Sequence, residues 1–445
     1  MSELEITPII GVEVHVELET KSKMFCGCPA WHFDTKPNSQ TCPVCLGLPG
    51  ALPVPNKAAI EQTIMIGLAL GGEVADESKF DRKNYFYPDL PKGYQISQYD
   101  QPLCSEGELK LASGKVVGIE RVHLEEDTGK LQHAEVEGRK VSLVDFNRSG
   151  VPLVEIVRKP DLASAEEAKE YLKKLKQVIV WLGVSKADME KGQMRLEPTV
   201  NVKIKKNDTV YYTPLVEVKN INSFNFAAQA IEYEVERQVE EWEETGVVKN
   251  KGNKTTRGYD SVKKVTFVQR RKEEANDYRY FPEPDIPPLL FGDDQIAGLR
   301  EKMPELPEEM KKKMLEVGVR NDYAEILLDD KQRLLKVLEM VERGVEEKVE
   351  VNKLVGMVIN KNLVDFEIEK VIEEVKKESS KVFASEGQTK EWIIKAIREN
   401  PQAVVDYAKG KGTAVKFLMG QVMRLGKGQV DPKNLEEKML EQLRG

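Results

Sequence analysis

Polar and apolar residues alternate along the first predicted strand, residues 8–18. Glu13, His15 and Glu17 fall on one face of this strand and the apolar residues on the other, because successive strand side chains point to opposite sides. Similar short runs predict further strands at 116–126, 141–147, 151–158, 198–205 and 211–219. Strands therefore dominate the chain up to about residue 290.

Two amphipathic helices interrupt these strands. One begins at Ser164-Ala-Glu-Glu167, a capping-box pattern. The second follows Asn222-Ser223. Their apolar faces carry Leu172, Leu175, Ile179 and Leu182 in the first helix and Ile231, Val235, Val239 and Trp242 in the second. Strands with inserted helices and no regular βαβ alternation predict an α+β fold with a large mixed or antiparallel sheet.

The rest of the chain is predicted to be helical, in two parts. Residues 295–383 are rich in Lys, Glu and Leu and form a helical linker domain. Residues 384–445 form a small all-α tail domain, whose helices begin near Trp392, at Asn400-Pro401, at Ala414 and at Asp431-Pro432. Residues 1–294 are the first, sheet-containing domain, with a metal-binding segment at 26–45.

Composition narrows the possible classes of protein. With 445 residues, 40% hydrophobic and 32% charged, the chain is long enough for two or three domains with proper cores. No apolar run approaches a membrane span, and the acidic first residues do not resemble a basic targeting sequence, so we expect a cytoplasmic protein without membrane contact. The net charge of −8 argues against indiscriminate coating of nucleic acid. It remains compatible with an RNA-binding enzyme that uses a local basic face.

Four cysteines lie in two close pairs, Cys26 with Cys28 and Cys42 with Cys45. Thiolates at these spacings suit tetrahedral zinc, and four Cys ligands leave no open catalytic position, so we predict a structural zinc site. His32 could replace one thiol as a ligand. The alternative is four buried or free thiols; disulfides are disfavoured in a reducing compartment.

Acidic residues recur beside two of the four histidines. Glu125 and Glu126 follow His123, and Glu155 lies within the otherwise apolar run 151–157. A buried carboxylate is costly unless it is paired or binds a metal. Oxygen ligands suit Mg²⁺ and imidazole does not, so His15 either lies beside the metal or ligates an ion such as Mn²⁺. For Glu13 and Glu17 the alternative is a solvated strand face.

Four segments combine cations, amides and tyrosines, as sites for anionic ligands do. They are residues 80–99, 145–148, 217–223 and 277–285, and their recurrence predicts a large polar cleft. The chain lacks a phosphate-binding P-loop, a dinucleotide-binding glycine motif and a Gly-x-Ser-x-Gly elbow. The residues alone thus indicate a metal-assisted enzyme with a zinc clip and an unidentified substrate.

Several long motifs resemble the B subunit of the tRNA-dependent amidotransferases, the GatB/GatE family. They stand in the family's order at 11–15, 22–26, 42–53, 80–99, 123–130, 142–148, 219–223 and 277–288, and the tail stretch 410–424 is similar to the family's C-terminal domain. Because no large inserted domain interrupts the chain, the resemblance is to the bacterial type and not to the archaeal relative.

This resemblance implies an ATP- and Mg²⁺-dependent ligase that acts on misacylated tRNA. Such an enzyme phosphorylates the side-chain carboxylate of Glu-tRNA(Gln) or Asp-tRNA(Asn), and ammonia then forms the amide. The ammonia comes from a glutaminase partner, the A subunit, in a complex that includes a small C subunit. Two other classes compete with this interpretation: a non-catalytic tRNA-binding scaffold of the same fold, and a stand-alone zinc-ribbon nucleic-acid binder, which the acidic N-terminal half disfavours.

The family's functional positions carry over to particular residues here. They imply magnesium ligands at Glu13, His15, Glu125 and Glu155, with Glu126 possible, and structural zinc ligands at Cys26, Cys28, Cys42 and Cys45. Further catalytic residues would be Lys83, Arg148 and Lys219, and the cleft for ATP and the acyl end would include Asn84, Tyr85, Lys92 and Tyr94. A basic surface for the tRNA body would comprise Lys409, Lys411, Lys416, Arg424 and Lys427, for which the alternative is solvated helix faces.

The chain departs from the family pattern at two places. Residues 195–201 replace a usual Arg-Cys-Asp-x-Asn-like stretch, so the part that this strand plays in the cleft stays open. The segment at about 320–385 is shorter and more charged than is typical.

Overall fold

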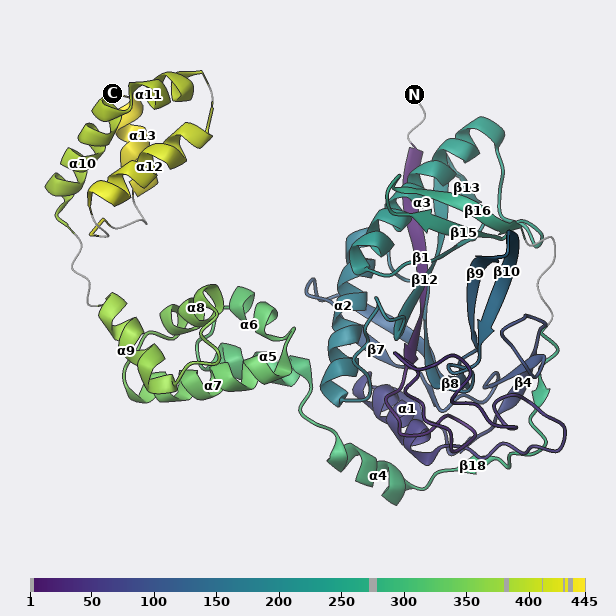
Figure 1. Ribbon diagram of the computed structural model, residues 1–445. Helices are drawn as coiled ribbons and strands as arrows, with labels where there is room; N and C mark the ends of the chain where they lie inside the picture. Colours follow the sequence, from purple (N-terminus) through teal and green to yellow (C-terminus); the bar gives the residue numbers. More distant parts are fainter. Residues whose placement is uncertain are drawn as a thin grey trace. The chain divides into compact units, whose positions relative to one another are not determined.

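The computed structural model describes residues 4–271, 278–379, 384–409, 411–426, 429–430 and 435–444 (Figure 1). The chain divides into two compact units, Met1–Met310 and Lys311–Gly445. The predicted α+β class is confirmed: a sheet-rich unit is followed by helices. The finer domain boundaries at residues 294 and 383 stay predictions.

The first unit is built on an 11-stranded sheet with β1 (Leu4–Glu17) near its centre. Its strand order is β16-β15-β14-β12-β1-β11-β8-β6-β2, with β13 paired to β12 and β7 to β8. Described neighbours pair antiparallel except β14 and β15, which are parallel. The other strands are β2 (Glu73–Val74), β6 (Cys104–Ser105), β7 (Glu108–Lys110), β8 (Val116–Glu126), β11 (Pro152–Arg158), β12 (Met194–Lys206), β13 (Thr209–Tyr212), β14 (Val216–Lys219), β15 (Thr255–Asp260) and β16 (Val265–Arg271).

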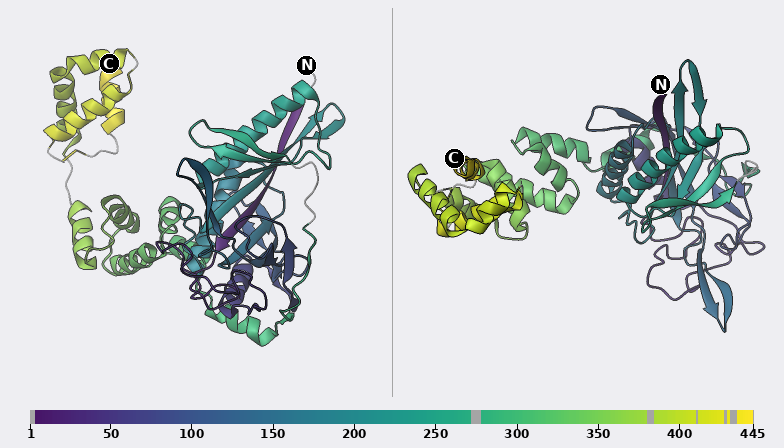
Figure 2. Two further views of the ribbon diagram at one scale, coloured as in Figure 1. Left: turned by 45° about the vertical axis from the view of Figure 1, so that its right-hand side comes forward. Right: turned by 90° about the horizontal axis from the view of Figure 1, so that it is seen from above.

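Smaller strand groups surround this sheet. The pair β9 (Lys130–Val136) and β10 (Arg139–Asp145) forms a two-stranded arm that extends from the unit (Figure 2). A three-stranded sheet joins β17 (Phe281–Pro282), β4 (Asp81–Asn84) and β5 (Tyr94–Ser97), and β18 (Leu289–Leu290) pairs with β3 (Glu77–Ser78).

One predicted strand is wrong. Residues 211–219 form two strands, β13 and β14, on either side of Thr213 and Pro214. Proline has no N–H to donate to a strand ladder, and the Thr213 hydroxyl accepts a bond from the backbone N–H of Val202 at 2.8 Å. Pairing with β12 is therefore divided between the two pieces. The strand predicted at 141–147 also lies two residues earlier, as β10.

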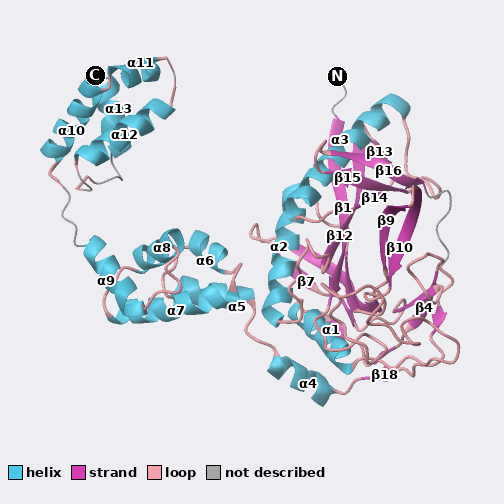
Figure 3. Ribbon diagram, viewed as in Figure 1, coloured by secondary structure: helices cyan, strands magenta, loops and turns pink. Residues whose placement is uncertain are grey.

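Helices α2 (Ala165–Leu182) and α3 (Phe224–Thr245) lie against one face of the main sheet (Figure 3). Ser164 caps α2 by accepting from the backbone N–H of Glu167, but the Glu167 carboxylate accepts from Ala163 N–H, so only half of a capping box forms. Leu172, Leu175 and Ile179 are fully buried, as predicted.

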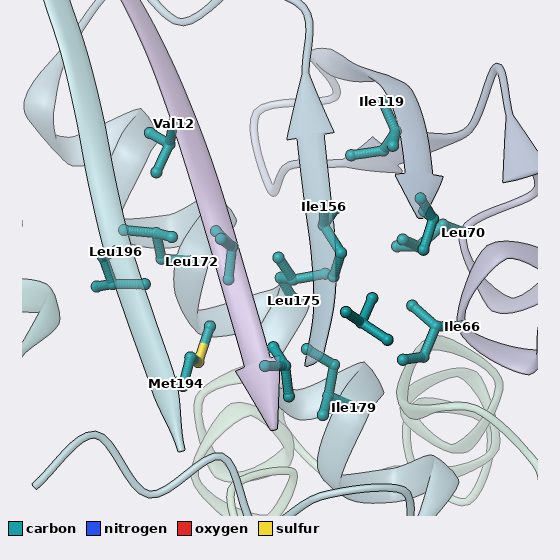
Figure 4. Close-up of a cluster of buried hydrophobic side chains, with 14 of the residues drawn as sticks. Val12, Ile66, Leu70, Ile119, Ile156, Leu172, Leu175, Ile179, Met194 and Leu196 are labelled. Atoms are coloured by element: carbon teal, nitrogen blue, oxygen red, sulfur yellow. The ribbon is translucent and has the colours of Figure 1, made fainter. Parts of the chain in front are cut away.

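The core lies between these helices and the apolar face of the sheet. Leu172 and Leu175 of α2 lie beside Val12, Ile156 and Leu196 from three adjacent strands (Figure 4). Since strand side chains alternate, Glu13, His15 and Glu155 point away from the helices, to the opposite face. The same alternation that builds the core thus places the polar residues together.

Of the remaining helices, α1 (Lys57–Ala69) was not predicted from the sequence, whereas those after residue 290 fall in the part of the chain predicted to be helical. The first unit contains α1 and also α4 (Asp293–Lys302), and α5 (Pro307–Glu316) spans the division between the units. The second unit contains α6 (Asn321–Leu327), α7 (Lys331–Glu346), α8 (Val351–Lys361), α9 (Ile368–Ser379), α10 (Glu386–Glu399), α11 (Pro401–Ala408), α12 (Thr413–Leu425) and α13 (Leu435–Arg444).

The last four helices share a small core that includes Ile393, Leu418, Val422 and Met439. The predicted helix start at Asp431-Pro432 lies outside the described residues. No helix in the described ranges combines the length and the apolar character that crossing a membrane requires.

Candidate active site and metal centre

Histidines and carboxylates from three adjacent strands meet on the polar face of the main sheet. In the strand register, His15 of β1 lies opposite Glu155 of β11, and Glu155 lies opposite His123 of β8. His123 Nε2 is 3.0 Å from Glu155 Oε2, while His15 Nε2 lies 3.6 Å from that oxygen and 3.8 Å from Glu125 Oε1. The register therefore builds a compact cluster from residues that are distant in sequence.

The charges in this cluster depend on one another. Burial alone would raise the pKa of Glu155, but His123 and His15 hold it well below its usual value. Burial alone would lower the pKa of His15, but Glu155, together with Glu197 and Glu125, raises it to about 9. The carboxylates thus attract positive charge strongly, in this case a proton on His15.

A divalent cation fits the same group. One ligand atom each from His15, Glu125 and Glu155 lies within 4.8 Å of the others. Ser97 Oγ donates to Glu125 Oε2 at 3.1 Å and so orients this carboxylate, and the buried Nδ1 atoms of His15 and His123 have no hydrogen-bond partner among the described residues. The two carboxylates suit Mg²⁺, whereas the imidazole of His15 suits an ion such as Mn²⁺ better.

Glu13 lies beside this group but outside the compact set of three. It stands opposite Glu197 of β12 and is half-buried. Burial raises its pKa, and the nearby charges of Glu155 and Glu197 raise it further. Glu13 therefore extends the acidic surface toward β12.

Lys83 supplies positive charge close to the acidic cluster. This residue lies on β4, and its ammonium is 5.3 Å from the centre of the Tyr278 ring. Burial would lower its pKa, but Glu125 and Glu155 more than compensate and raise it, so Lys83 stays protonated. Tyr85, on the same segment, donates its hydroxyl to Gln95 Oε1 at 3.2 Å.

Lys219 lies on another strand of the sheet, β14. Its ammonium is 2.9 Å from Glu197 and 3.0 Å from Glu217, and Lys254 also lies 3.0 Å from Glu217. Although burial would raise the pKa of Glu217, the two lysines lower it to about 2. Lys219 is thus held by two carboxylates.

Arg148 belongs to a second charged group, centred on the buried Asp127. Its guanidinium donates to the carbonyl oxygens of Thr128 and Gly129 at 3.0 and 2.8 Å, and its Nε lies 3.6 Å from Asp127. Arg195 of β12 bonds directly to the Asp127 carboxylate. Burial alone would raise the pKa of Asp127, but Arg148 and Arg195 keep it below its usual value.

Lys92 and Tyr94 line a cavity of about 220 Å³, and Cys26, Cys45 and Glu126 are among the other residues that line it. Lys92 Nζ is 2.5 Å from Glu126 Oε1, which also accepts the backbone N–H of Ile96 at 3.0 Å. Asn84 has another role: its amide donates to the carbonyl oxygen of Arg279 at 2.8 Å and joins two chain segments. Lys92 and Tyr94 therefore fit a ligand-lining role better than Asn84 does.

The four cysteines form one cluster. The Sγ atoms of Cys26, Cys28, Cys42 and Cys45 lie within 4.8 Å of one another, and the backbone N–H of Cys42 donates to Cys45 Sγ at 3.2 Å. This set of donors fits a structural zinc site. His32 does not join it, because its Nε2 lies 3.1 Å from Glu17 Oε2.

The basic residues of the tail lie at its surface. Lys409, Lys411, Lys416 and Arg424 are exposed on and around α11 and α12. Lys411 pairs with Asp406 at 3.2 Å. Lys427 lies outside the described residues.

Sequence reasoning missed several members of the polar face. Asp127, Arg195 and Glu197 were not predicted as site residues, and neither was His123, although its acidic neighbours were. Alternation within 195–201 places Arg195 and Glu197 on one face of a strand, which was a usable signal. Strand β12 therefore contributes charges to the polar face of the sheet.

Comparison with known proteins gives matches along nearly the whole chain. Residues 8–297 match the family model described as the GatB/GatE catalytic domain, and residues 309–443 match one described as the GatB domain. Proteins named as the B subunit of aspartyl/glutamyl-tRNA(Asn/Gln) amidotransferase are 40% identical, among them those of Roseiflexus castenholzii and Thermotoga maritima. Each alignment covers 98% of this chain, and it covers 98% of the Roseiflexus protein and 99% of the Thermotoga protein. Both alignments are longer than the chain's 445 residues, so these relatives carry residues that this chain lacks.

Proposed function

The chain belongs to the GatB/GatE family. We propose that, as the B subunit of an amidotransferase, it activates and amidates the side-chain carboxylate of the amino acid that a misacylated tRNA carries. The observation that carries this proposal is the polar face of the main sheet. There, a buried acidic cluster that fits a divalent cation lies close to the protonated Lys83. Transfer of a phosphoryl group needs this combination of positive charges.

The reaction proceeds in two steps, phosphorylation of the carboxylate and then amidation. A side-chain carboxylate oxygen of Glu-tRNA(Gln) or Asp-tRNA(Asn) attacks the γ-phosphorus of ATP, and the bond to ADP breaks. Ammonia then attacks the carbonyl carbon of the acyl phosphate, inorganic phosphate leaves, and the nitrogen loses a proton. Activation is necessary because a free carboxylate is a poor electrophile with a poor leaving group.

The residues of the chain divide this work between them. His15, Glu125 and Glu155, with Glu13 beside them, would hold Mg²⁺, which neutralises phosphate charge when it is bound. Ser97 and His123 orient Glu125 and Glu155. Lys83, Arg148 and Lys219 would offer positive charge to the phosphates or the carboxylate, and Tyr85, Lys92 and Tyr94 would line the approach.

The proposal extends to cofactors and partners. It assigns ATP and Mg²⁺ to the polar face and a structural zinc ion to the four cysteines. A glutaminase A subunit would deliver the ammonia, with a small C subunit in the same complex, and the exposed basic residues of the tail would contact the tRNA body. We place this complex in the cytoplasm, with carbon–nitrogen ligase activity.

The decisive experiment measures transfer of labelled γ-phosphate from ATP to the aminoacyl end of Glu-tRNA(Gln) and Asp-tRNA(Asn). It uses the chain co-purified with its partner subunits, without ammonia, in the presence and absence of Mg²⁺. We expect an Mg²⁺-dependent, tRNA-linked acyl phosphate, and the two substrates can be ranked directly. Tight tRNA binding without labelled product would instead support a non-catalytic scaffold.

A further inference from the structure

Lys23 is the feature that the catalytic proposal does not use. Its side chain is fully buried, with an exposed fraction of 0%. Its ammonium donates to the carbonyl oxygens of Gln40 and Phe146, at 2.8 and 3.3 Å, and to Cys45 Sγ at 3.7 Å. A buried lysine is costly unless a negative charge accompanies it.

The expected carboxylate partner is absent from the described part of the chain. None of its aspartates or glutamates forms an ion pair with Lys23, and Glu126, which lies nearby across Gly150, is paired with Lys92. The negative group that Lys23 does contact is the sulfur of Cys45, which is a thiolate whenever the cluster holds zinc. Four thiolates outweigh the charge of one zinc ion, so the loaded centre carries excess negative charge inside the protein.

We propose that Lys23 is the counter-charge of the zinc tetrathiolate and fastens the metal centre to the turn that carries Arg148. The ammonium and the zinc centre then compensate each other: each is expensive to bury alone and stable when both are present. This inference rests on the zinc site and not on the catalytic proposal.

The fastening follows from the hydrogen bonds around Lys23. Lys23 donates to Phe146 O, in the turn at residues 146–150 that also carries Arg148. The cysteine-bearing loop at residues 26–45 reaches the same turn through the backbone N–H of Gln40, which donates to Asn147 Oδ1 at 2.8 Å. Ser149 Oγ in turn donates to Cys45 O at 3.1 Å. Arg148 lies within this turn and contacts Asp127. Loss of zinc should therefore loosen the turn, starting at the Lys23 bond.

Gly150 gives the turn its backbone conformation beside Cys45 and Lys23. Its φ is +85°, a conformation that favours glycine, and an added Cβ would stand 3.4 Å from Cys45 Cβ and 3.6 Å from Lys23 Cδ. The backbone of the turn thus packs directly on the buried lysine and on one zinc ligand.

The test measures the rate of zinc transfer from the purified, zinc-loaded full chain to a chromophoric chelator. Lys23→Gln keeps a donor but removes the charge, Lys23→Met removes both, and Lys21→Gln, at an exposed position two residues earlier, is the matched control. We expect zinc release to be about 10- to 100-fold faster in both Lys23 variants, as for other residues that support metal ligands, and unchanged in the control. Release from Lys23→Gln at the control rate would overturn the charge assignment.

A compensating variant keeps the inference testable if a Lys23 variant folds poorly. Cys45→His replaces one thiolate by a neutral ligand and so removes one negative charge from the centre. It should restore zinc retention to Lys23→Gln, and absence of any restoration would contradict the proposal.

A second measurement examines the fastening in the unmodified chain. Hydrogen exchange at residues 144–150 should accelerate when zinc is removed, whereas exchange in α2 should not change. Equal protection of the turn with and without zinc would show that Lys23 does not couple the two.

Discussion

The polar face of the main sheet and the helical tail place their charged residues in opposite ways. On the sheet, the carboxylates of Glu125, Glu155 and Asp127 are buried. Ion pairs with His123 and Arg195 hold Glu155 and Asp127, and a hydrogen bond from Ser97 holds Glu125. In the tail, Lys409, Lys416 and Arg424 are exposed on or beside helices that share an apolar core. Buried charges are held in fixed positions relative to reacting atoms, whereas exposed charges attract a polyanion without fixing its position.

The largest effect should come from the buried cluster. Glu125→Gln removes a charge beside Glu155 and His15 with little change of shape, and it should lower amide formation by about a hundredfold or more, because metal assistance is worth several kcal/mol. The rate is measured with Glu-tRNA(Gln) and Asp-tRNA(Asn) in the assembled enzyme. Affinity for tRNA should persist, and Glu135→Gln, an exposed change on β9, serves as the control. Unchanged amide formation would refute a metal-binding role for Glu125.

A smaller effect is expected from the tail. The double variant Lys416→Ala with Arg424→Ala should weaken tRNA binding and reduce the slope of log affinity against log salt by about 0.7–0.9 for each phosphate that the protein no longer neutralises. Glutamine hydrolysis and ATP cleavage should not change. The matched double variant Lys390→Ala with Lys395→Ala changes exposed positions on α10. An equal loss of affinity in both doubles would indicate general electrostatics without a defined surface.

The stability of the sheet should also depend on pH, through the buried carboxylate of Glu217 on β14. The pKa of Glu217 falls from 4.5 to about 2 in the folded protein, because Lys219 and Lys254 outweigh its burial. Its ion pairs therefore stabilise the fold above the pKa of the unfolded chain, and this stabilisation is lost as the pH falls from about 4.5 toward 2.

Glu217→Gln measures this contribution. We expect a loss of about 1–2 kcal/mol of unfolding free energy near neutral pH, reduced because both lysines are partly exposed, and a smaller difference near pH 3. Urea unfolding of the full chain at both pH values gives the result. A difference that is independent of pH would mean that Glu217 acts through packing alone.

The smallest effects should come from removing a helix cap, and each of the two compact units offers one such cap. Ser164→Ala removes the cap of α2, and Ser385→Ala removes the capping box of α10. Each should cost about 1 kcal/mol. If the two units unfold separately, calorimetry should show a lower midpoint only for the unit that carries the change; a shift of both transitions would show that the units unfold together.

The extent of sequence prediction follows the range of the interactions. Local patterns sufficed to predict the polar face of β1, the buried side of α2 and the two closely spaced pairs of cysteine ligands, because each depends on neighbours within a few residues. The contact of His123 with Glu155 depends on strand register, and that of Arg195 with Asp127 joins segments far apart in the chain; neither is visible in a local pattern.

The buried polar residues of α3 illustrate a second limit. Periodicity selected Val235 and Val239 for the core, but Glu234 and Gln238 are more completely buried. Arg257 and Thr266 satisfy Glu234, and Thr213 satisfies Gln238. Such burial depends on partners that arrive from other strands, so hydrophobicity alone points to the wrong side chains.

The central position of β1 has a consequence for how the protein matures. Its partners β11 and β12 begin at residues 152 and 194, so a ribosome must synthesise about half of the first unit before β1 can pair with β11, and more before it can pair with β12. Until then its alternating apolar side chains and both of its edges are unsatisfied, which is a hazard for aggregation. The acidic cluster is consequently assembled late, and we expect a chaperone that shields the nascent β1 to improve the yield of active protein more than its final stability.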